Sequence, residues 1–162
     1  MTPKSSLHIN PFERTWLIIS IATLVGFVLA ITVAAFAFGI QVPSPEARVD
    51  PKTLNQTEPW SKPGLRELAP DKYEVYIVSR MFQFNPSEIT IPAGSTVTFY
   101  VTSGDVQHGF KLQDTNINMQ IVPGQVSSLT TVFDKPGTYN FICTEFCGTA
   151  HQTMYGKLIV TP

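Results

Sequence analysis

The chain has 162 residues, with 12 acidic and 11 basic side chains and a formal charge of −1. Charged residues make up 14% of it, well below the roughly 25% of a typical soluble domain. This balance excludes global disorder and a nucleic-acid partner held by a basic surface, and two cysteines are too few for a disulfide scaffold. The length allows one ordinary domain and one additional element.

The first element is a long uncharged stretch, Thr15–Pro45, whose centre from Trp16 to Ile40 is almost entirely apolar. About 20 apolar residues suffice to cross a bilayer as a helix. We therefore predict a transmembrane helix over residues 15–42, preceded by a cytoplasmic segment, residues 1–14. A cleaved signal peptide is the alternative, but its apolar region is typically only about 7–15 residues long. Basic residues flank both ends in nearly equal number, so orientation rests on the short N-terminal and long C-terminal sides.

The rest of the chain changes character twice. Residues 43–70 are rich in proline and mixed charges, which predicts an extended connector over the membrane surface. From Tyr73 onward, apolar residues alternate with period two in short runs separated by turn signals such as Pro136-Gly137. Many short strands without a helical stretch predict that residues 71–162 form a small, antiparallel, all-β sandwich or barrel.

A cluster of soft metal ligands lies near the end of this domain. Within residues 143–154 fall Cys143, Cys147, His151 and Met154. A further histidine, His108, lies in a turn-like stretch upstream. Thiolate, imidazole and thioether together favour copper, whereas structural zinc takes four Cys or His ligands. A mononuclear blue-copper site uses one thiolate and leaves one spare, while two thiolates can bridge two ions, each with one imidazole and one weak axial ligand. A simple disulfide between the two cysteines is the other alternative.

The motif resembles a known family. The run from Pro136 to Cys143, followed by the pattern C-x-E-x-C-G-x3-H-x2-M, resembles subunit II of haem–copper cytochrome c oxidases. The stretches Asp105–Phe110, which contains His108, and Asn116–Met119 resemble it as well. The usual A-type subunit II has two transmembrane helices, so the single helix predicted here resembles the B-type branch.

This resemblance implies a cupredoxin-like Greek-key sandwich or barrel on the outer face of a prokaryotic plasma membrane. It implies a dinuclear copper A centre with six donors: His108, Cys143, the backbone carbonyl of Glu145, Cys147, His151 and Met154. It also implies that the domain accepts electrons from cytochrome c and passes them to haem in subunit I, which reduces oxygen to water and translocates protons. The chain is then an enzyme only as part of that complex, because the oxygen site is not on it.

Several other residues have more than one interpretation. Glu13 resembles a carboxylate at the mouth of a proton pathway into subunit I, and a glutamate that favours the helix dipole is the alternative. The carboxylate of Glu145 is a candidate magnesium ligand, as in A-type relatives. Phe141, Phe146 and Tyr155 would keep water from the copper, and the first two are interpreted as ordinary core. The weak charge of the domain predicts an apolar docking patch for cytochrome c.

Three alternatives belong to other classes of protein. Membrane-anchored, thioredoxin-like copper assembly proteins also use C-x3-C with a distant histidine, but proline typically follows where this chain has Gly148. Their fold also needs helices between strands. Subunit II of quinol oxidases shares the fold and lacks the copper ligands. Nitrous oxide reductase carries the same copper site on a much longer chain.

Overall fold

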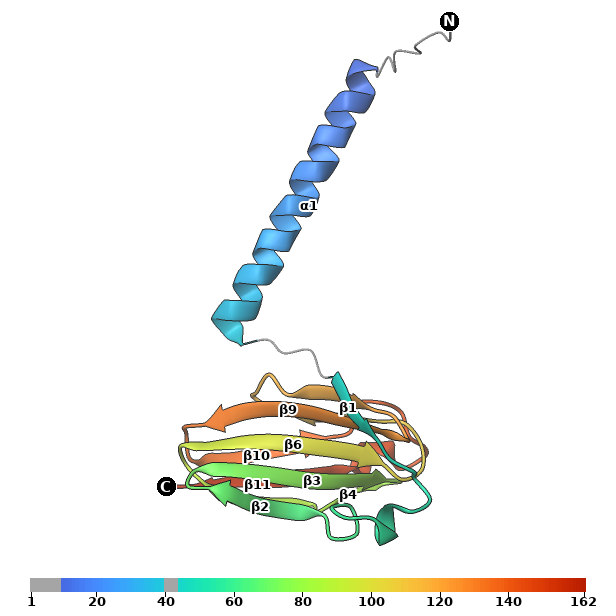
Figure 1. Cartoon of the computed structure of the whole chain (residues 1–162), viewed down its shortest axis with the longest axis vertical. Helices are drawn as coiled ribbons and strands as arrows, with labels where there is room; N and C mark the ends of the chain where they lie inside the picture. Colours follow the sequence, from blue (N-terminus) through green and yellow to red (C-terminus); the bar gives the residue numbers. More distant parts are fainter. Residues whose placement is uncertain (1–9, 40–43) are drawn as a thin grey trace, which may run out of the picture. The chain divides into compact units, whose positions relative to one another are not determined.

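The computed structural model describes residues 10–39 and 44–162 (Figure 1). They belong to two compact units, residues 1–40 and 41–162, and most of the predicted N-terminal segment lies outside the described residues. The first unit holds one helix and the second holds the β domain, so an apolar helix and an all-β domain are both confirmed.

The helix α1 spans Pro11–Phe38 and is apolar on all sides, with no buried residue. Its 28 residues correspond to about 42 Å, more than the roughly 30 Å of a bilayer's hydrocarbon core. It starts four residues earlier than predicted because the Asn10 side chain accepts a hydrogen bond from the backbone N–H of Phe12 at 2.9 Å, and proline suits the first helical position. It stops four residues earlier because Gly39 adopts a left-handed φ of 60°.

The β domain consists of two facing sheets (Figure 1). The first has the order β1–β9–β6–β3–β2, with β4 also paired to β3, and the second has the order β5–β11–β10–β7–β8. The strands of the first sheet are β1 (Ser44–Arg48), β2 (Gly64–Ala69), β3 (Lys72–Arg80), β4 (Gln83–Asn85), β6 (Ser95–Ser103) and β9 (Gln125–Phe133). Those of the second are β5 (Glu88–Pro92), β7 (His108–Leu112), β8 (Asn118–Ile121), β10 (Gly137–Ile142) and β11 (Tyr155–Thr161). Two short 3-10 helices, η1 (Leu54–Gln56) and η2 (His151–Thr153), lie between strands.

The core fills the space between the two sheets, as their alternating apolar residues predict. Its centre is a group of phenylalanine rings from both sheets, with centroids 5.2–5.8 Å apart: Phe84, Phe99, Phe110 and Phe141. The same buried cluster includes Cys143, Cys147 and Met154. The candidate ligands are therefore continuous with the packed core.

The expectation of a purely antiparallel sandwich is wrong for two strand pairs. β3 pairs with β6 in parallel, and β5 pairs with β11 in parallel. Between β3 and β6 the chain crosses to the second sheet as β5 before it returns, so it re-enters the first sheet in the same direction. A crossover of this kind leaves no mark on the period-two pattern of a single strand.

The segment 43–70, expected to be an extended connector, instead contributes two strands to the domain. β1 pairs with β9, and β2 pairs with β3. Between them, Leu54 and Trp60 are buried against Val78 and Val126 on the outer face of the first sheet. These apolar side chains explain the difference, because burying them stabilises a chain that proline and charge alone would leave extended.

Candidate metal centre

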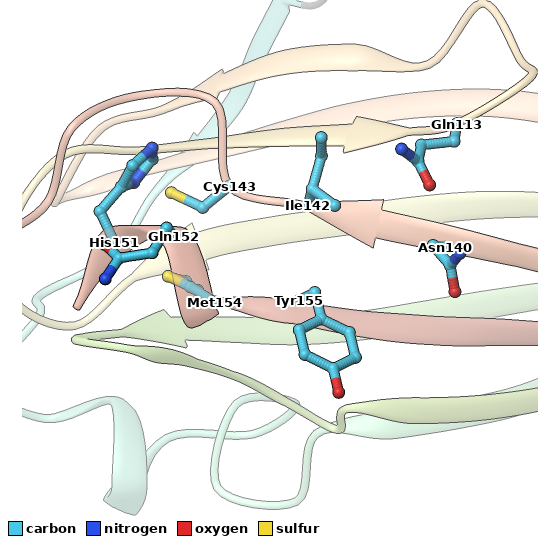
Figure 2. A pocket seen from close by; sticks show the side chains of 8 residues that line it. All are labelled: Gln113, Asn140, Ile142, Cys143, His151, Gln152, Met154 and Tyr155. Atoms are coloured by element: carbon cyan, nitrogen blue, oxygen red, sulfur yellow. The ribbon is translucent and has the colours of Figure 1, made fainter.

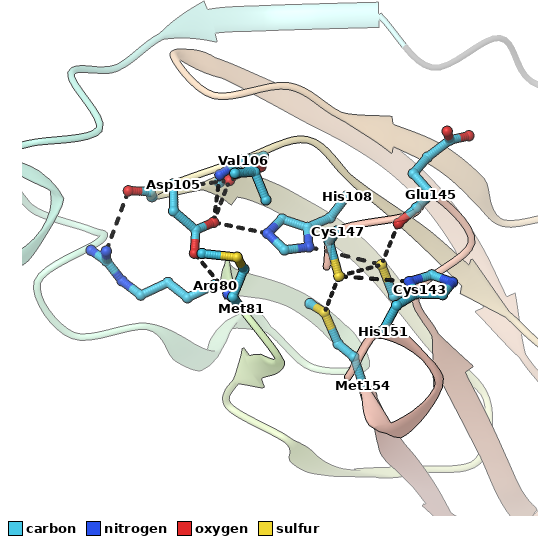
Figure 3. A network of polar contacts seen from close by, with 12 residues as sticks. Arg80, Met81, Asp105, Val106, His108, Cys143, Glu145, Cys147, His151 and Met154 are labelled. Atoms are coloured by element: carbon cyan, nitrogen blue, oxygen red, sulfur yellow. Dashed lines mark hydrogen bonds and ion pairs between the residues drawn. The ribbon is translucent and has the colours of Figure 1, made fainter. Parts of the chain in front are cut away.

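The six donors predicted from the sequence meet at one end of the β domain (Figure 3). His108 is the first residue of β7, and Cys143 follows the end of β10 directly. The loop after it carries Glu145 and Cys147, η2 carries His151, and Met154 immediately precedes β11. The donors thus come from the start of β7 and from the stretch between β10 and β11.

The two sulfur atoms lie at the centre of this group. Cys143 Sγ and Cys147 Sγ are 3.9 Å apart, and both cysteines are free. Cys143 Sγ lies 3.8 Å from His108 Nδ1 and 3.3 Å from the carbonyl oxygen of Glu145. His151 Nδ1 and Met154 Sδ lie 3.6 Å and 3.8 Å from the second sulfur.

This geometry fits two metal ions that share both thiolates. A disulfide requires sulfur atoms about 2.05 Å apart, so the 3.9 Å separation excludes a bond between Cys143 and Cys147. Metal–thiolate bonds of about 2.3 Å allow two sulfurs on one ion to be as far apart as about 4.6 Å. Each sulfur also has its own imidazole and its own weak donor, which is the set that a thiolate-bridged pair of copper ions would use.

The Cys147 thiol is protonated before metal arrives. Burial, followed by the neighbouring Cys143 thiol, raises the pKa of the Cys147 thiol. Because a thiolate is the ligand form, metal binding at this site must release protons.

An aspartate that the sequence reasoning left without a role holds one of the imidazoles (Figure 3). His108 is fully buried, and its Nε2 lies 2.9 Å from Asp105 Oδ1, so Nε2–H donates and Nδ1 stays free to face the sulfur. The same carboxylate accepts backbone N–H bonds from Met81 and Val106, both at 2.7 Å. The available signal was a carboxylate three residues before a candidate histidine ligand, because ligating histidines usually donate their second N–H to such a group.

Burial raises the pKa of Asp105, but hydrogen bonds from His108, Met81 and Val106 outweigh this and lower it below its ordinary value. The carboxylate is consequently charged at neutral pH, which keeps His108 in one tautomer and one orientation.

Two glycines allow the ligand loop to approach this closely. A side chain at Gly109 would collide with the hydroxyl and backbone of Thr144, which follows Cys143. Gly148 has a φ of 135°, and a Cβ there would lie 2.9 Å from the Phe82 ring. Both positions therefore require glycine for the loop to close over the sulfurs.

The expectation that Phe146 is ordinary core is wrong, and Tyr155 is also at the surface. Phe146 is 80% exposed and Tyr155 is 57% exposed, whereas Phe141 is fully buried as predicted. The turn that brings Cys143 and Cys147 inward directs the residue just before the second cysteine outward. The Phe146 ring centroid lies 6.0 Å from that of His151, so an exposed aromatic ring stands next to a candidate ligand.

The other two acidic candidates, the carboxylates of Glu145 and Glu13, have different surroundings. The Glu145 backbone carbonyl faces Cys143, while its carboxylate points away and accepts a 3.5 Å hydrogen bond from Gln107 (Figure 3). Glu13 occupies the first turn of α1, in the other compact unit, where a negative charge favours the helix dipole.

Comparison with known proteins agrees with the fold. A profile of the cupredoxin-like domain matches residues 30–160. Fold, apolar helix and soft donor set thus define a membrane-anchored cupredoxin of the copper-binding kind. Subunit 2 of the cytochrome c oxidase of Thermus thermophilus is 37% identical over 161 residues, 97% of this chain and 96% of that one. The chain belongs to the cytochrome c oxidase subunit II family, and so is the subunit that admits electrons to a haem–copper oxidase.

A solved structure and a second enzyme are also similar to this chain. A chain in the structure of a haem–copper terminal oxidase has 36% identity and a TM-score of 0.75, over 91% of this chain and 98% of that one. Nitrous-oxide reductase of Stutzerimonas stutzeri is 38% identical over 96 residues, 57% of this chain but only 15% of that enzyme. The likeness to the reductase is thus confined to one domain. The thioredoxin-like alternative is wrong, because in the described β domain η1 and η2 are the helices and both are three-residue 3-10 turns.

Proposed function

We propose that His108, Cys143, the Glu145 carbonyl, Cys147, His151 and Met154 hold a dinuclear copper A centre that takes electrons from cytochrome c and delivers them to haem in subunit I. The observation that carries the proposal is the pair of sulfurs 3.9 Å apart, each with its own imidazole. When bound, such a centre supplies a one-electron carrier whose charge is shared between two ions.

The protein's part is to keep these donors in place. Cys143, Cys147 and Met154 are 7%, 5% and 2% exposed, so only a small part of each of these residues is in contact with solvent. The sulfurs are packed into the same cluster as the phenylalanine core, and Asp105 holds His108. Donors fixed in this way move little when the charge of the centre changes, which favours fast electron transfer.

The electron donor would dock on an apolar rim, which we define as Met81, Val106, Phe146 and Tyr155. All four are exposed, and all adjoin the site: the first two bind Asp105 through their backbone N–H groups, and the last two flank ligands. Residues 71–162 hold five basic and seven acidic side chains, so the field that would steer a charged partner is weak. Docking of cytochrome c should therefore depend mainly on apolar contact.

We propose that α1 lies among lipid and subunit I in a prokaryotic plasma membrane, with the N-terminus cytoplasmic and the copper domain on the outer face. The apolar surface of α1 on every side supports contact with lipid and with other apolar helices.

Glu13 is proposed as a carboxylate at the mouth of a proton pathway into subunit I. Its place in the first, exposed turn of α1 leaves the carboxylate reachable from water. In the assembled oxidase, Glu13→Gln should slow turnover and leave the copper spectra unchanged. Equal turnover in the two forms would assign Glu13 to the helix dipole alone.

Copper content and spectra of the full chain in detergent test the central proposal. We expect about two copper ions per chain and an EPR signal of one unpaired electron delocalised over two coppers. Cys147→Ser, which removes one bridging thiolate and keeps the shape, should abolish that signal. One copper with a blue mononuclear spectrum would instead indicate a simple electron carrier. No copper, with Cys143 and Cys147 joined as a disulfide, would refute copper binding.

A further inference from the structure

A hollow of about 370 Å³ opens beside the candidate ligands and follows β10 (Figure 2). Three of the six donors line its inner end: Cys143, His151 and Met154. Uncharged side chains form the rest of its wall: Gln113, Asn140, Ile142, Gln152 and Tyr155. The hollow is thus an opening in the surface that leads to soft ligands.

The opposite side of the site is closed. His108 is fully buried, and its outer nitrogen is bonded to Asp105. Where the ligand loop passes Gly109, the Thr144 hydroxyl and backbone leave no room even for a methyl group. Among the described residues, access to the sulfurs is therefore asymmetric, with the open side at His151.

We propose that copper(I) is loaded through this hollow, and the proposal rests on the copper-binding function given above. The ion would bind first to Cys143, His151 and Met154, and then reach Cys147 and His108 behind them. Each thiol releases its proton as its sulfur binds, and no electron changes hands in this step. Thiolate and thioether select copper(I) among the common ions, so the wall of the hollow is chemically suited to this cargo.

The size of the hollow indicates how the ion arrives. A water molecule occupies about 30 Å³ of liquid, and a bare ion needs no more, so about 370 Å³ leaves room for the ligands of a carrier. Copper(I) can therefore be transferred by ligand exchange, with Cys143 or Met154 replacing a carrier ligand before the ion is released. None of the lining residues is an aspartate, glutamate, lysine or arginine, so a complex of either sign can enter.

Two glutamines provide a matched test, because each is exposed and adjoins a candidate histidine ligand. Gln152 follows His151 and lines the hollow, whereas Gln107 precedes His108 on the closed side. The reduced, metal-free full chain in detergent is mixed with copper(I) bound to the coloured chelator bicinchoninate, and the loss of colour gives the rate of uptake. Gln152→Trp should slow uptake by about tenfold, and Gln107→Trp by less than about twofold.

Asn140→Trp, farther along the hollow on β10, is a second blocking variant that does not adjoin a ligand. It should also slow uptake, while the final copper content of all variants equals that of the wild type. Equal rates for Gln152→Trp, Asn140→Trp and Gln107→Trp would overturn the loading route and leave the copper function intact. A wild-type chain that takes up no copper would overturn both.

Discussion

The two imidazole donors have opposite surroundings. His108 is fully buried at the start of β7, and Asp105 fixes its ring through a 2.9 Å hydrogen bond. His151 is half-buried in the three-residue helix η2, next to the exposed Phe146. One side of the site is therefore fixed by the packed scaffold, and the other side faces the surface, where we propose that copper and electrons arrive. The His108 imidazole is thus held rigidly, whereas the His151 imidazole can be reached from the surface.

Removing each imidazole in turn should give the largest difference between the two sides of the site. His108→Ala leaves a cavity in the core and removes one hydrogen-bond partner of the Asp105 carboxylate, so we expect the metal-free chain to lose about 3 kcal/mol of stability. His151→Ala removes a half-buried side chain and should cost less than about 1 kcal/mol. Urea unfolding of both variants in the same detergent, followed by circular dichroism, measures the difference. Equal losses would contradict the division into a fixed and an open side.

A smaller effect is expected from Asp105→Asn, which keeps the shape and removes the charge. Copper affinity should fall by about 10–100-fold, as is typical when the group behind a ligating histidine is changed. Competition with a copper chelator measures the affinity. Asp114→Asn is a suitable control, because this aspartate is exposed in a turn with a φ of 58° that asparagine also tolerates. A similar loss in the control would mean that the effect is one of general charge.

Asp105→Asn should also change how the stability of the chain depends on pH in the acid range. The pKa of Asp105 is lowered in the folded chain, so its ionised form contributes stability above the unfolded value of about 3.9. That contribution is lost as the pH falls through the lowered pKa. The metal-free wild type should accordingly lose more stability than Asp105→Asn between neutral pH and the acid range. Parallel curves for the two forms would show that the carboxylate is not stabilised by its three partners.

On the open side, Phe146→Ala should slow electron transfer from cytochrome c by about tenfold, because a central aromatic side chain often carries much of the binding energy. The copper spectrum should not change, since Phe146 supplies no donor atom. Val132→Ala removes an exposed side chain from β9, outside the apolar rim, and serves as the control. Salt should alter the wild-type rate by only about twofold over the physiological range. A steep fall with salt would indicate docking by charge.

The smallest effect is expected from Glu145→Gln. The backbone carbonyl faces the sulfur and the carboxylate points away, so copper content and spectra should stay within error of the wild type. A loss of bound magnesium from the assembled oxidase, measured by elemental analysis, would give the carboxylate a separate role. A loss of copper would contradict the assignment of the carbonyl as the donor.

The sequence was most informative where ligands lie close together along the chain. Cys143, Cys147, His151 and Met154 fall within twelve residues, and their chemistry names the metal without any structure. The six runs of alternating apolar residues correspond to strands in both sheets. Local pattern and local chemistry are sufficient for features of this kind.

Features that depend on the approach of distant segments were harder to predict. The role of Asp105 requires the chain to bring Met81, 24 residues earlier, onto the same carboxylate. The exposure of Phe146 depends on the direction of a turn whose two cysteines both point inward. The sequences of β1 and β2 have weak strand patterns, and these segments are strands because they pair with β9 and β3. For the Met81–Asp105 contact and for the two strand pairings, the partner residue is one that sequence spacing does not indicate.

The membership of Cys143, Cys147 and Met154 in the phenylalanine core has an evolutionary consequence. In most small β domains, selection acts on a core substitution only through its effect on folding stability. Here Phe84 and Phe110 belong to the same buried cluster as these three side chains, so we expect a change at either position to alter the packing around the sulfur atoms and the reduction potential as well. Such positions should accept fewer substitutions among related chains than equally buried ones at the far end of the sandwich, and the reduction potential offers a trait on which small repacking changes can act.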